Sequence, residues 1–312
     1  FHSIFYYDQA PQVKVYRQRQ LFQFLKSVDL LYIRVDGQFG MEKLTCLKFL
    51  KMMRLPVIWE INSPVEEMII RGKSPQQVRW WSIQRKCLAR WVDAAICVSR
   101  EMEQYAKKQL GIKRVIYIPN GSDKVLFSPQ KRDEAVYSHL KGQFKVIWAG
   151  CAYYAWQGWD IIIDVAQKMQ EIDKDIVFIF VTQIEEVKNR DKLPSNIVLI
   201  DTKDYLEMPP YLASADAGLC LYHLLGGKSS FYFSPLKLYD YMASSLPVIA
   251  TDVGQISEVI KDGHNGFLVD NGIDQIIEKI LFLKNNPHEA QRMGQLTRKM
   301  VEDYYNLDRV GE

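Results

Sequence analysis

The sequence predicts an α/β protein that contains two doubly wound parallel sheets. Short apolar segments rich in valine and isoleucine alternate with longer segments of helical periodicity, the pattern of parallel βαβ units. The alternation begins at Asp29, stops over residues 120–143 and restarts at Lys145. The interruption is rich in turn formers and has no clear period, so we expect a linker there. A chain of 312 residues also exceeds one ordinary core and fits two domains of roughly 150 residues each.

Each half has its own set of expected elements. In the first half, the apolar pattern predicts strands at residues 30–35, 56–61, 94–99 and 114–119, with helices near residues 40–54, 74–92 and 100–110. In the second half, it predicts strands at residues 145–150, 176–182, 197–201, 217–222, 247–251 and 266–270, with helices near residues 158–172 and 208–214 and from residue 235. Sheets of this kind bind ligands at the carboxyl ends of their strands, so we expect the functional site at that edge.

Composition and charge exclude several classes of protein. The chain is 48% hydrophobic and 25% charged, as in a soluble globular protein, and its net charge of +3 gives no general electrostatic case for binding nucleic acid. The five cysteines are scattered without a CxxC pair, which favours reduced thiols, a cytoplasmic setting and no zinc site. No apolar run is long enough to span a membrane. Because the chain begins at Phe1 rather than at a methionine, we expect the true N-terminus to lie upstream.

One helix carries an unusual pair of charges. Residues 234–252 read SPLKLYDYMASSLPVIATD, in which Ser234 is the predicted N-cap and Pro235 the first helical residue. Lys237 and Asp240 are three residues apart and therefore share one face of this otherwise apolar helix. A surface ion pair of a few tenths of a kcal/mol is one interpretation. A ligand that meets both side chains is the other.

The order of motifs resembles the retaining glycosyltransferases of the GT-B fold, in particular glycosyltransferase family 4. The resemblance rests on DYMASSLPVIATDVGQISEVIKDGHNGFLVD (240–270), on ICVSREMEQYAKKQLGIKRVIYIPNGSDKVLFSP (96–129) and on PPYLASADAGLCLY (209–222). It implies two Rossmann-like domains that face a cleft, with a C-terminal helix that crosses back to the first domain. The expected parts are an acceptor domain (1–123) that lacks its first strand, loop and helix, a linker (124–143), a nucleotide-sugar domain (144–295) and the crossing helix (296–312).

The resemblance also implies a reaction, the transfer of a sugar from a nucleotide-diphosphate sugar to a saccharide or lipid-linked acceptor with retention. No cofactor and no metal are expected, and the pathway would be the synthesis of a bacterial-type surface polysaccharide, lipopolysaccharide or glycolipid. The diphosphate would lie at the helix N-terminus, at Ser234, Pro235, Leu236 and Lys237, because free N–H groups and a cation bind phosphate there. Lys237 would stabilise the leaving diphosphate, and Asp240 would accept hydrogen bonds from the ribose hydroxyls.

Other expected donor-binding positions depart from the family pattern. The resemblance places Gly150, Cys151, Gln157, Lys203 and Tyr232 around the donor, but Cys151 and Gln157 stand where the family usually has an arginine and a lysine. Tyr232 stands where an acidic residue is usual, and Lys228 could supply further positive charge. These changes leave open a catalytically inactive nucleotide-sugar-binding subunit. A GT-B sugar-nucleotide epimerase is a weaker alternative.

The expected acceptor side rests on one residue and one helix. Asn62 occupies the position of a family histidine that faces the sugar; it could bind a sugar hydroxyl as a catalytic residue, or simply begin a turn before Ser63 and Pro64. In the helix opened by the Ser74 capping box, the cations Arg79, Lys86 and Arg90 lie beside a stripe that includes Trp80. Such a face suits an anionic membrane surface, so the expected location is cytoplasmic, with peripheral contact to the cytoplasmic face of the membrane. Alternatively, the tryptophans pack into the core and the cations solvate the outer face.

Overall fold

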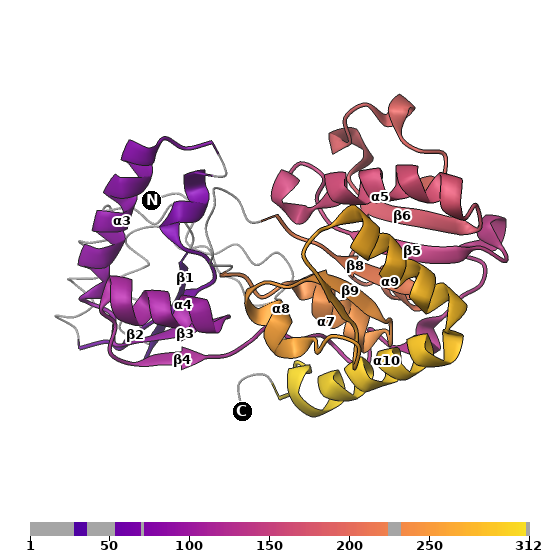
Figure 1. Ribbon diagram of the computed structural model, residues 1–312. Helices are drawn as coiled ribbons and strands as arrows, with labels where there is room; N and C mark the ends of the chain where they lie inside the picture. The colour runs from indigo at the N-terminus through magenta and orange to yellow at the C-terminus, as the bar shows by residue number, and fades with distance from the viewer. Residues whose placement is uncertain (1–27, 36–53, 70–71, 224–231, 310–312) are drawn as a thin grey trace. The chain divides into compact units, whose positions relative to one another are not determined.

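The computed structural model describes residues 28–35, 54–69, 72–223 and 232–309, which are coloured in Figure 1. The chain forms two compact units, and each is considered by itself. The first unit comprises Phe1–Ile61, Val65–Ile96 and Ala106–Val115, and the second comprises Asn62–Pro64, Cys97–Tyr105 and Ile116–Glu312. The helix expected near residues 40–54 and the segment around Lys228 lie outside the described residues.

The first sheet contains the four strands that the apolar pattern predicts. They are arranged in the order β1-β2-β3-β4 and comprise Leu31–Val35, Val57–Ile61, Ala94–Cys97 and Val115–Tyr117. Strands β1 and β2 are parallel, with Leu31 opposite Val57. Every second side chain of β2 is fully buried, including Trp59, which gives this sheet its apolar layer.

The helices of this part of the chain also match the sequence pattern. Helix α3 (Pro75–Ala89) begins with the predicted capping box, because Ser74 and Gln77 exchange side-chain to backbone hydrogen bonds. It packs against the 3₁₀ turn η2 (Val65–Ile69). Helix α4 (Arg100–Tyr105) continues into a π-helical turn, η3 (Ala106–Leu110). None of the helices in the described part of the chain has the length and apolar character needed to cross a membrane.

The second sheet has six strands in the order β10-β9-β8-β5-β6-β7, and all of its pairs are parallel. The strands, in chain order from β5 to β10, are Phe144–Ala149, Ile176–Thr182, Ile197–Asp201, Ala217–Cys220, Val248–Thr251 and Phe267–Val269. Each one confirms a predicted strand. The chain adds β6 and β7 on one side of β5, and then β8, β9 and β10 on the other side. The carboxyl ends of β5 and β8 therefore flank the crevice where doubly wound sheets bind ligands.

Alternate residues of each central strand contribute to two separate cores. On β6, the side chains of Ile176, Phe178 and Phe180 face α5 (Trp159–Ile172) and α9 (Ile273–Asn285). The intervening residues face the opposite core, with α6 (Pro209–Ala213), α7 (Leu236–Ala243) and α8 (Gly254–Val259). Figure 1 shows helices on both faces of this sheet. The unit is therefore doubly wound, as predicted, although α8 and α9 are not among the predicted helices.

The segment expected to be a linker is packed into the second unit. Phe127, Tyr137 and Leu140 are buried in the core that also contains α7. Two 3₁₀ turns, η4 (Pro129–Lys131) and η5 (Ser138–Leu140), shape the segment. The expected domain boundaries and the return of the C-terminal helix to the first domain stay predictions.

Helix α10 (Pro287–Met300) closes the second unit and continues into the π-helical turn η10 (Val301–Tyr305). Arg298 joins three segments, since its Nη1 donates to the carbonyl oxygens of Phe127 and Ala243, each at 2.7 Å. Gly294 allows α10 to approach the turn between α7 and β9. A Cβ at this position would lie 2.0 Å from the carbonyl oxygen of Ser245.

We predict that Gly294→Ala destabilises the protein by about 2 kcal/mol or more, because α10 must move away from that turn. A loss of stability would be specific to the close approach, since a change of glycine to alanine inside a helix ordinarily stabilises a protein by up to about 1 kcal/mol. Chemical denaturation measures the free energy of unfolding. Gln295→Ala, at the exposed neighbouring position, is the matched control and should change it by less than about 0.5 kcal/mol. A Gly294→Ala protein as stable as the wild type would contradict the close approach.

Candidate functional site

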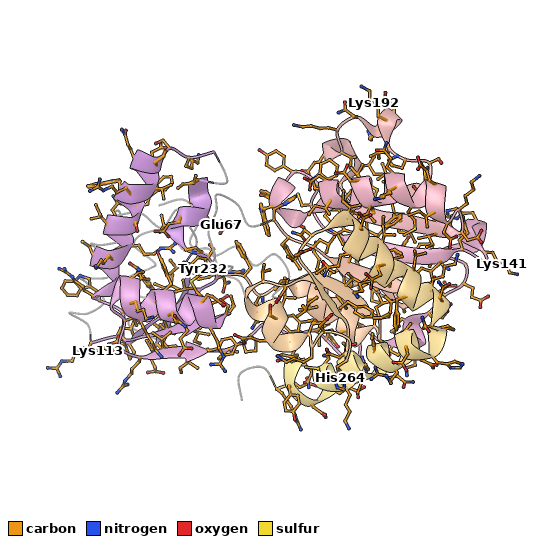
Figure 2. All side chains as sticks on the ribbon, in the orientation of Figure 1. Glu67, Lys113, Lys141, Lys192, Tyr232 and His264 are labelled. Carbon is orange, nitrogen blue, oxygen red and sulfur yellow. The ribbon has the colours of Figure 1, made fainter. Side chains whose placement is uncertain are left out.

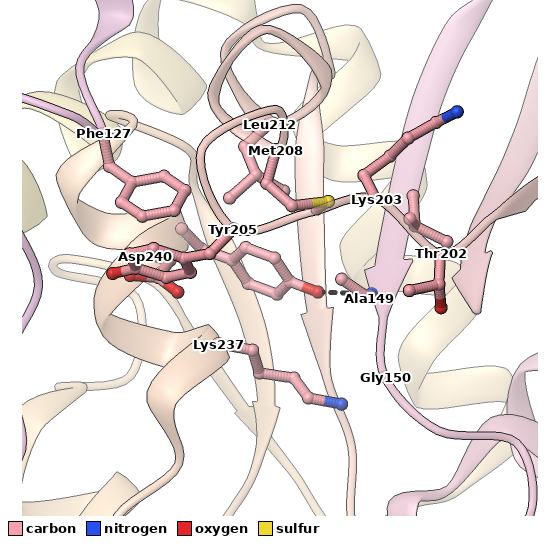
Figure 3. Close-up of a pocket in the computed structure, with 12 residues that line it drawn as sticks. Phe127, Ala149, Gly150, Thr202, Lys203, Tyr205, Met208, Leu212, Lys237 and Asp240 are labelled. Atoms are coloured by element: carbon pink, nitrogen blue, oxygen red, sulfur yellow. Dashed lines mark hydrogen bonds between the residues drawn. The ribbon is translucent and has the colours of Figure 1, made fainter. Parts of the chain in front are cut away.

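A pocket of about 210 Å³ lies in the second unit, next to the carboxyl ends of β5, β6 and β7 and the first turns of α7 (Figure 3). Two positions that the sequence singled out, Lys237 and Asp240, share one wall of it. Gly150 and Lys203 line it as well. The described lining residues are Phe127, Ala149, Gly150, Val181, Thr202, Lys203, Tyr205, Met208, Leu212, Lys237, Asp240 and Tyr241. The pocket thus occupies the edge of the sheet at which doubly wound folds bind ligands.

The predicted capping role of Ser234 is wrong. Helix α7 begins at Leu236 with Pro235 as its N-cap, and no side chain caps it. The hydroxyl of Ser234 instead accepts a hydrogen bond from the backbone N–H of Asn120 at 3.1 Å, and its carbonyl accepts one from Asn120 Nδ2 at 2.7 Å. A tertiary partner has therefore taken the group that would have capped the helix. Neither Ser234, Pro235 nor the exposed Leu236 lines the pocket.

The ammonium of Lys237 lies among neutral groups. Its Nζ donates to Gln157 Oε1 at 3.1 Å, and it lies 4.7 Å from the ring centre of Trp148 and 5.4 Å from that of Tyr222. Cation–π contacts of this kind favour the charged form. Desolvation by burial dominates nevertheless and lowers the pKa of Lys237 to about 8. In Figure 3 the ammonium points toward the backbone at Gly150.

Asp240 is held from a different segment. Ser122, two residues after Asn120, donates its hydroxyl to Asp240 Oδ1 at 2.6 Å. Burial raises the pKa of Asp240 to about 7, and the Ser122 hydrogen bond opposes that shift. Among the residues that the structure describes, no ion pair joins Asp240 to Lys237. The interpretation of these residues as a surface ion pair is therefore wrong.

Aromatic side chains that the sequence analysis did not single out form the apolar wall of the pocket. The rings of Phe127 and Tyr205 meet edge to face with their centres 5.0 Å apart. Burial raises the pKa of Tyr205 above its usual range, and the nearby Asp240 carboxylate adds to the shift. The hydroxyl of Tyr241 accepts a hydrogen bond from the backbone N–H of Ala149 at 2.8 Å, the dashed line of Figure 3. These rings leave a partly apolar surface beside two desolvated charges.

The positions that depart from the family pattern lie on the border of this site. Gln157 contacts Lys237 directly and also accepts from the backbone N–H of Cys151 at 3.3 Å. The thiol of Cys151 donates to Glu186 Oε2 at 3.0 Å, and burial together with this hydrogen bond raises its pKa. Cys151 therefore supplies no positive charge in place of the family's arginine.

Tyr232, labelled in Figure 2, is held through its backbone and its ring. Its carbonyl oxygen accepts from the Ser99 hydroxyl at 2.6 Å, and its ring contacts that of Tyr105 with 5.9 Å between centres. It does not line the pocket. The tyrosine thus anchors the segment that leads into α7.

The expected acceptor-side residues lie elsewhere. Asn62 follows β2 directly and is not a lining residue of the pocket. Arg79, Trp80, Lys86 and Arg90 are all exposed on α3, with Trp80 54% accessible. Its neighbour Trp81 is the tryptophan that packs on the small core of Val65, Met68 and Val78. The core-packing alternative therefore fails for Trp80, while Trp81, which lies outside the predicted stripe, packs on the core.

No histidine is among the described residues that line the pocket. His264, labelled in Figure 2, lies in the turn before β10, where its backbone N–H donates to the carbonyl of Lys261. His223 Nε2 lies 2.9 Å from Asp160 Oδ1. Among the described residues, no group of three or more His, Cys, Asp and Glu side chains is arranged to hold a metal ion.

Comparisons of sequence connect both halves of the chain to glycosyltransferases. Residues 143–286 match the family model described as "Glycosyl transferases group 1", and residues 4–124 match "Glycosyltransferase Family 4". An uncharacterized glycosyltransferase of Methanocaldococcus jannaschii is 29% identical over 208 residues, 65% of this chain and 53% of that protein. A chitobiosyldiphosphodolichol beta-mannosyltransferase of Candida albicans is 21% identical over 254 residues, 74% of this chain and 54% of that protein. The chain thus spans about half the length of these curated relatives.

Comparison with solved structures identifies the fold. The Anabaena protein HepE in complex with UDP and glucose aligns with a TM-score of 0.71 at 15% identity, over 94% of this chain and 78% of that one. Sucrose-phosphate synthase from Thermosynechococcus elongatus aligns with a TM-score of 0.70 at 15% identity, over 97% and 79% of the two chains. The chain therefore has the GT-B fold with two Rossmann-like domains, and both halves match models of glycosyltransferase domains.

The raised pKa of Asp240 predicts a pH-dependent cost to stability. Its native pKa of about 7 lies above the usual unfolded value, so the native state binds more protons between about pH 4 and 7, and stability falls as pH rises through that window. Asp240→Asn cannot ionise and escapes this loss. We expect it to exceed the wild type in free energy of unfolding by about 1–3 kcal/mol at pH 8, and to match it within about 0.5 kcal/mol at pH 4.

Denaturation with urea at both pH values measures this difference. The control is Asp204→Asn, which makes the same change at an exposed position of the same unit and should show no such dependence on pH. A wild type that is more stable than Asp240→Asn at pH 8 would mean that the carboxylate stabilises the fold.

Proposed function

We propose that the chain is a glycosyltransferase that binds a nucleotide-diphosphate sugar in the pocket of its second unit and transfers the sugar, with retention, to an acceptor. The observation that carries this proposal is the placement of Lys237 and Asp240 on one wall of the pocket, each bound to a neutral partner. A cation and a carboxylate that do not pair with each other suit a ligand with both an anionic part and hydroxyl groups. A nucleoside diphosphate has both.

Different residues of the pocket would bind different parts of such a donor. The diphosphate would meet Lys237 in the first turn of α7, whose N-terminus no side chain caps. Asp240 keeps Oδ2 for the ribose hydroxyls, because Ser122 occupies only Oδ1. The rings of Tyr205 and Phe127 offer an apolar wall for the base. Lys203 adds a second cation to the lining, and no metal or cofactor is proposed.

Retention and the acceptor are the finer parts of the proposal. The leaving diphosphate gains negative charge as the glycosidic bond breaks, and Lys237 would stabilise that charge from a preorganised position. The names of two relatives indicate different linkages. One is a beta-mannosyltransferase, and the other is a Staphylococcus aureus alpha-N-acetylglucosaminyltransferase that acts on poly(ribitol phosphate). We propose a saccharide or lipid-linked acceptor of a surface polysaccharide, lipopolysaccharide or glycolipid, with Asn62 binding an acceptor hydroxyl.

A nucleotide-sugar-binding subunit without catalysis is the second candidate. It is favoured by Cys151 and Gln157, which remove two cations from the usual set, and by Tyr232, which supplies no carboxylate. Radiolabelled sugar transfer to an acceptor extract separates the candidates. Transfer that is lost in Lys237→Met supports the enzyme, whereas donor binding without transfer supports the subunit. Conversion of the donor into a second nucleotide sugar would indicate the epimerase instead.

We predict that Lys237→Met and Asp240→Asn have different effects on donor fragments. Charge-assisted hydrogen bonds contribute on the order of 1.5–3 kcal/mol each. Asp240→Asn should therefore weaken both the nucleoside and its diphosphate by roughly tenfold or more. Lys237→Met should weaken the diphosphate similarly and spare the nucleoside, which has no phosphate. Isothermal titration calorimetry measures the affinity of each variant for the nucleoside and for its diphosphate, with the base that the wild type prefers, and compares them with the wild-type values.

Two controls complete this experiment. Lys188→Met removes an exposed lysine of the same unit and should leave every affinity unchanged. Titration in EDTA should also leave them unchanged, because the proposed diphosphate site needs no metal. If neither Lys237→Met nor Asp240→Asn changes any affinity while the fold is intact, the proposed site is wrong. Binding that disappears in EDTA and returns with magnesium would refute metal independence.

The exposed face of α3 has the side chains that suit contact with a membrane surface. Trp80 and Ile83 are 54% and 50% accessible, and they lie beside the exposed cations Arg79, Lys86 and Arg90. Apolar side chains flanked by cations can insert at the headgroup level while the charges meet anionic lipids. We propose that this face contacts the membrane that carries a lipid-linked acceptor.

We predict that the protein sediments with anionic phosphatidylglycerol vesicles at low salt and is released as salt rises, because ions screen surface charge. The triple variant Arg79→Glu, Lys86→Glu and Arg90→Glu should lose this binding. The matched control makes the same change in net charge at the exposed Lys188, Arg190 and Lys192 of the second unit, and it should retain most of the binding. Equal recovery with neutral and anionic vesicles would contradict the membrane proposal.

A further inference from the structure

Lys237 has an environment that is unusual for a partly buried cation. Among the residues the structure describes, no carboxylate forms an ion pair with it. Within the described ranges its hydrogen-bond acceptor is Gln157 Oε1, at 3.1 Å, and the rings of Trp148 and Tyr222 lie close to it. All of these groups are neutral. The direction of the ammonium thus depends largely on one amide oxygen.

Gln157 is itself held at several points. Its backbone N–H donates to the carbonyl of Tyr154 at 2.9 Å, and its carbonyl accepts from Trp148 Nε1 at 3.3 Å. Its Oε1 faces two donors, the Lys237 ammonium and the Cys151 N–H. Because both neighbours donate, the amide must present its oxygen and not its nitrogen. The acceptor for Lys237 is therefore fixed in place by the loop after β5.

Gly150 provides the space in which these two groups meet. A Cβ at this position would lie 2.4 Å from Gln157 Oε1 and 2.8 Å from Lys237 Nζ. Any larger residue would push the amide and the ammonium apart. Gly150 and Lys237 line the pocket, whereas Gln157 does not. The contact between Gln157 and Lys237 thus lies next to the pocket wall.

A neutral acceptor has a chemical consequence that a carboxylate would not have. A glutamate at the same distance would pair with Lys237 and cancel most of its charge for any ligand. An amide oxygen orients the ammonium and leaves its full charge available to an anion. A lysine at this position would instead repel Lys237.

We propose that Gln157 is a positioning residue, whose Oε1 holds the Lys237 ammonium at the Gly150 edge of the pocket so that it faces a bound diphosphate. This inference rests on the proposed function, since it assigns the diphosphate as the group that Lys237 meets. Gln157 acts through Lys237 and does not contact the diphosphate itself. Removing Gln157 should therefore matter only while Lys237 is present.

A double-mutant cycle tests this dependence, with UDP and inorganic pyrophosphate as the probes. Gln157→Met, of similar length but without the acceptor, should weaken both probes about five- to tenfold in the wild-type background. It should have no further effect in a Lys237→Met background, and uridine should bind equally to all four proteins. Equal weakening in both backgrounds would overturn the inference, because Gln157 would then contact the ligand or support the fold directly.

A second measurement needs no ligand. Gln157→Glu places a carboxylate beside Lys237, so the lysine pKa should rise by more than one unit from about 8 in an NMR titration of isotopically labelled lysine. An unchanged lysine titration would overturn the contact itself. A wild type that binds neither UDP nor pyrophosphate would overturn the proposed function and the diphosphate assignment together. Binding by the wild type with additive effects in the cycle would overturn the inference alone.

Discussion

The burial of α7 is the constraint on which the rest of the site depends. Leu238, Tyr239, Tyr241 and Met242 are fully buried against the second sheet, so polar groups can occupy only one edge of the helix. Lys237 and Asp240 occupy that edge, and burial of the helix removes much of their contact with water. Desolvation lowers the pKa of the lysine and raises that of the aspartate. Each charge is therefore less stable than it would be in water, and a ligand with an anionic group for the lysine and hydroxyl groups for the aspartate can relieve both.

Much of the fold follows from local pattern. The segment from Ile176 to Thr182 is apolar throughout because both faces of a central parallel strand are covered, and its alternate residues enter the two separate cores. Turn-forming residues mark the ends of most strands, which explains why all ten described strands match predicted ones. Helix α9 carried the same kind of signal in the helical spacing of Ile276, Ile280 and Leu283. Local pattern could have identified it.

The site shows where local reasoning ends. The sequence indicated Lys237 and Asp240 because charges on an apolar helix are conspicuous, but it could not identify Ser122 or Gln157 as their partners, which lie 118 and 80 residues away. The same limit explains the error at Ser234. Capping rules assign its hydroxyl to the helix that follows, whereas the folded chain brings Asn120 to it from 114 residues away. Hydrogen bonds between distant segments override a local preference worth about 1 kcal/mol.

The hydrogen-bond partners of Lys237 and Asp240 also indicate that the two charges form a binding site rather than a structural ion pair. Two opposite charges kept for stability would gain most by pairing with each other, because each would then offset the desolvation of the other. Here the lysine is bound by an amide and the aspartate by a hydroxyl, and these partners come from two different loops. Neutral partners fix direction without cancelling charge, so the pocket retains two unbalanced charges at a cost to stability. Such a cost is expected at functional sites, where binding and stability favour different residues. The departures at Cys151 and Gln157 add to this effect, since they leave Lys237 and Lys203 as the cations among the described residues that line the pocket.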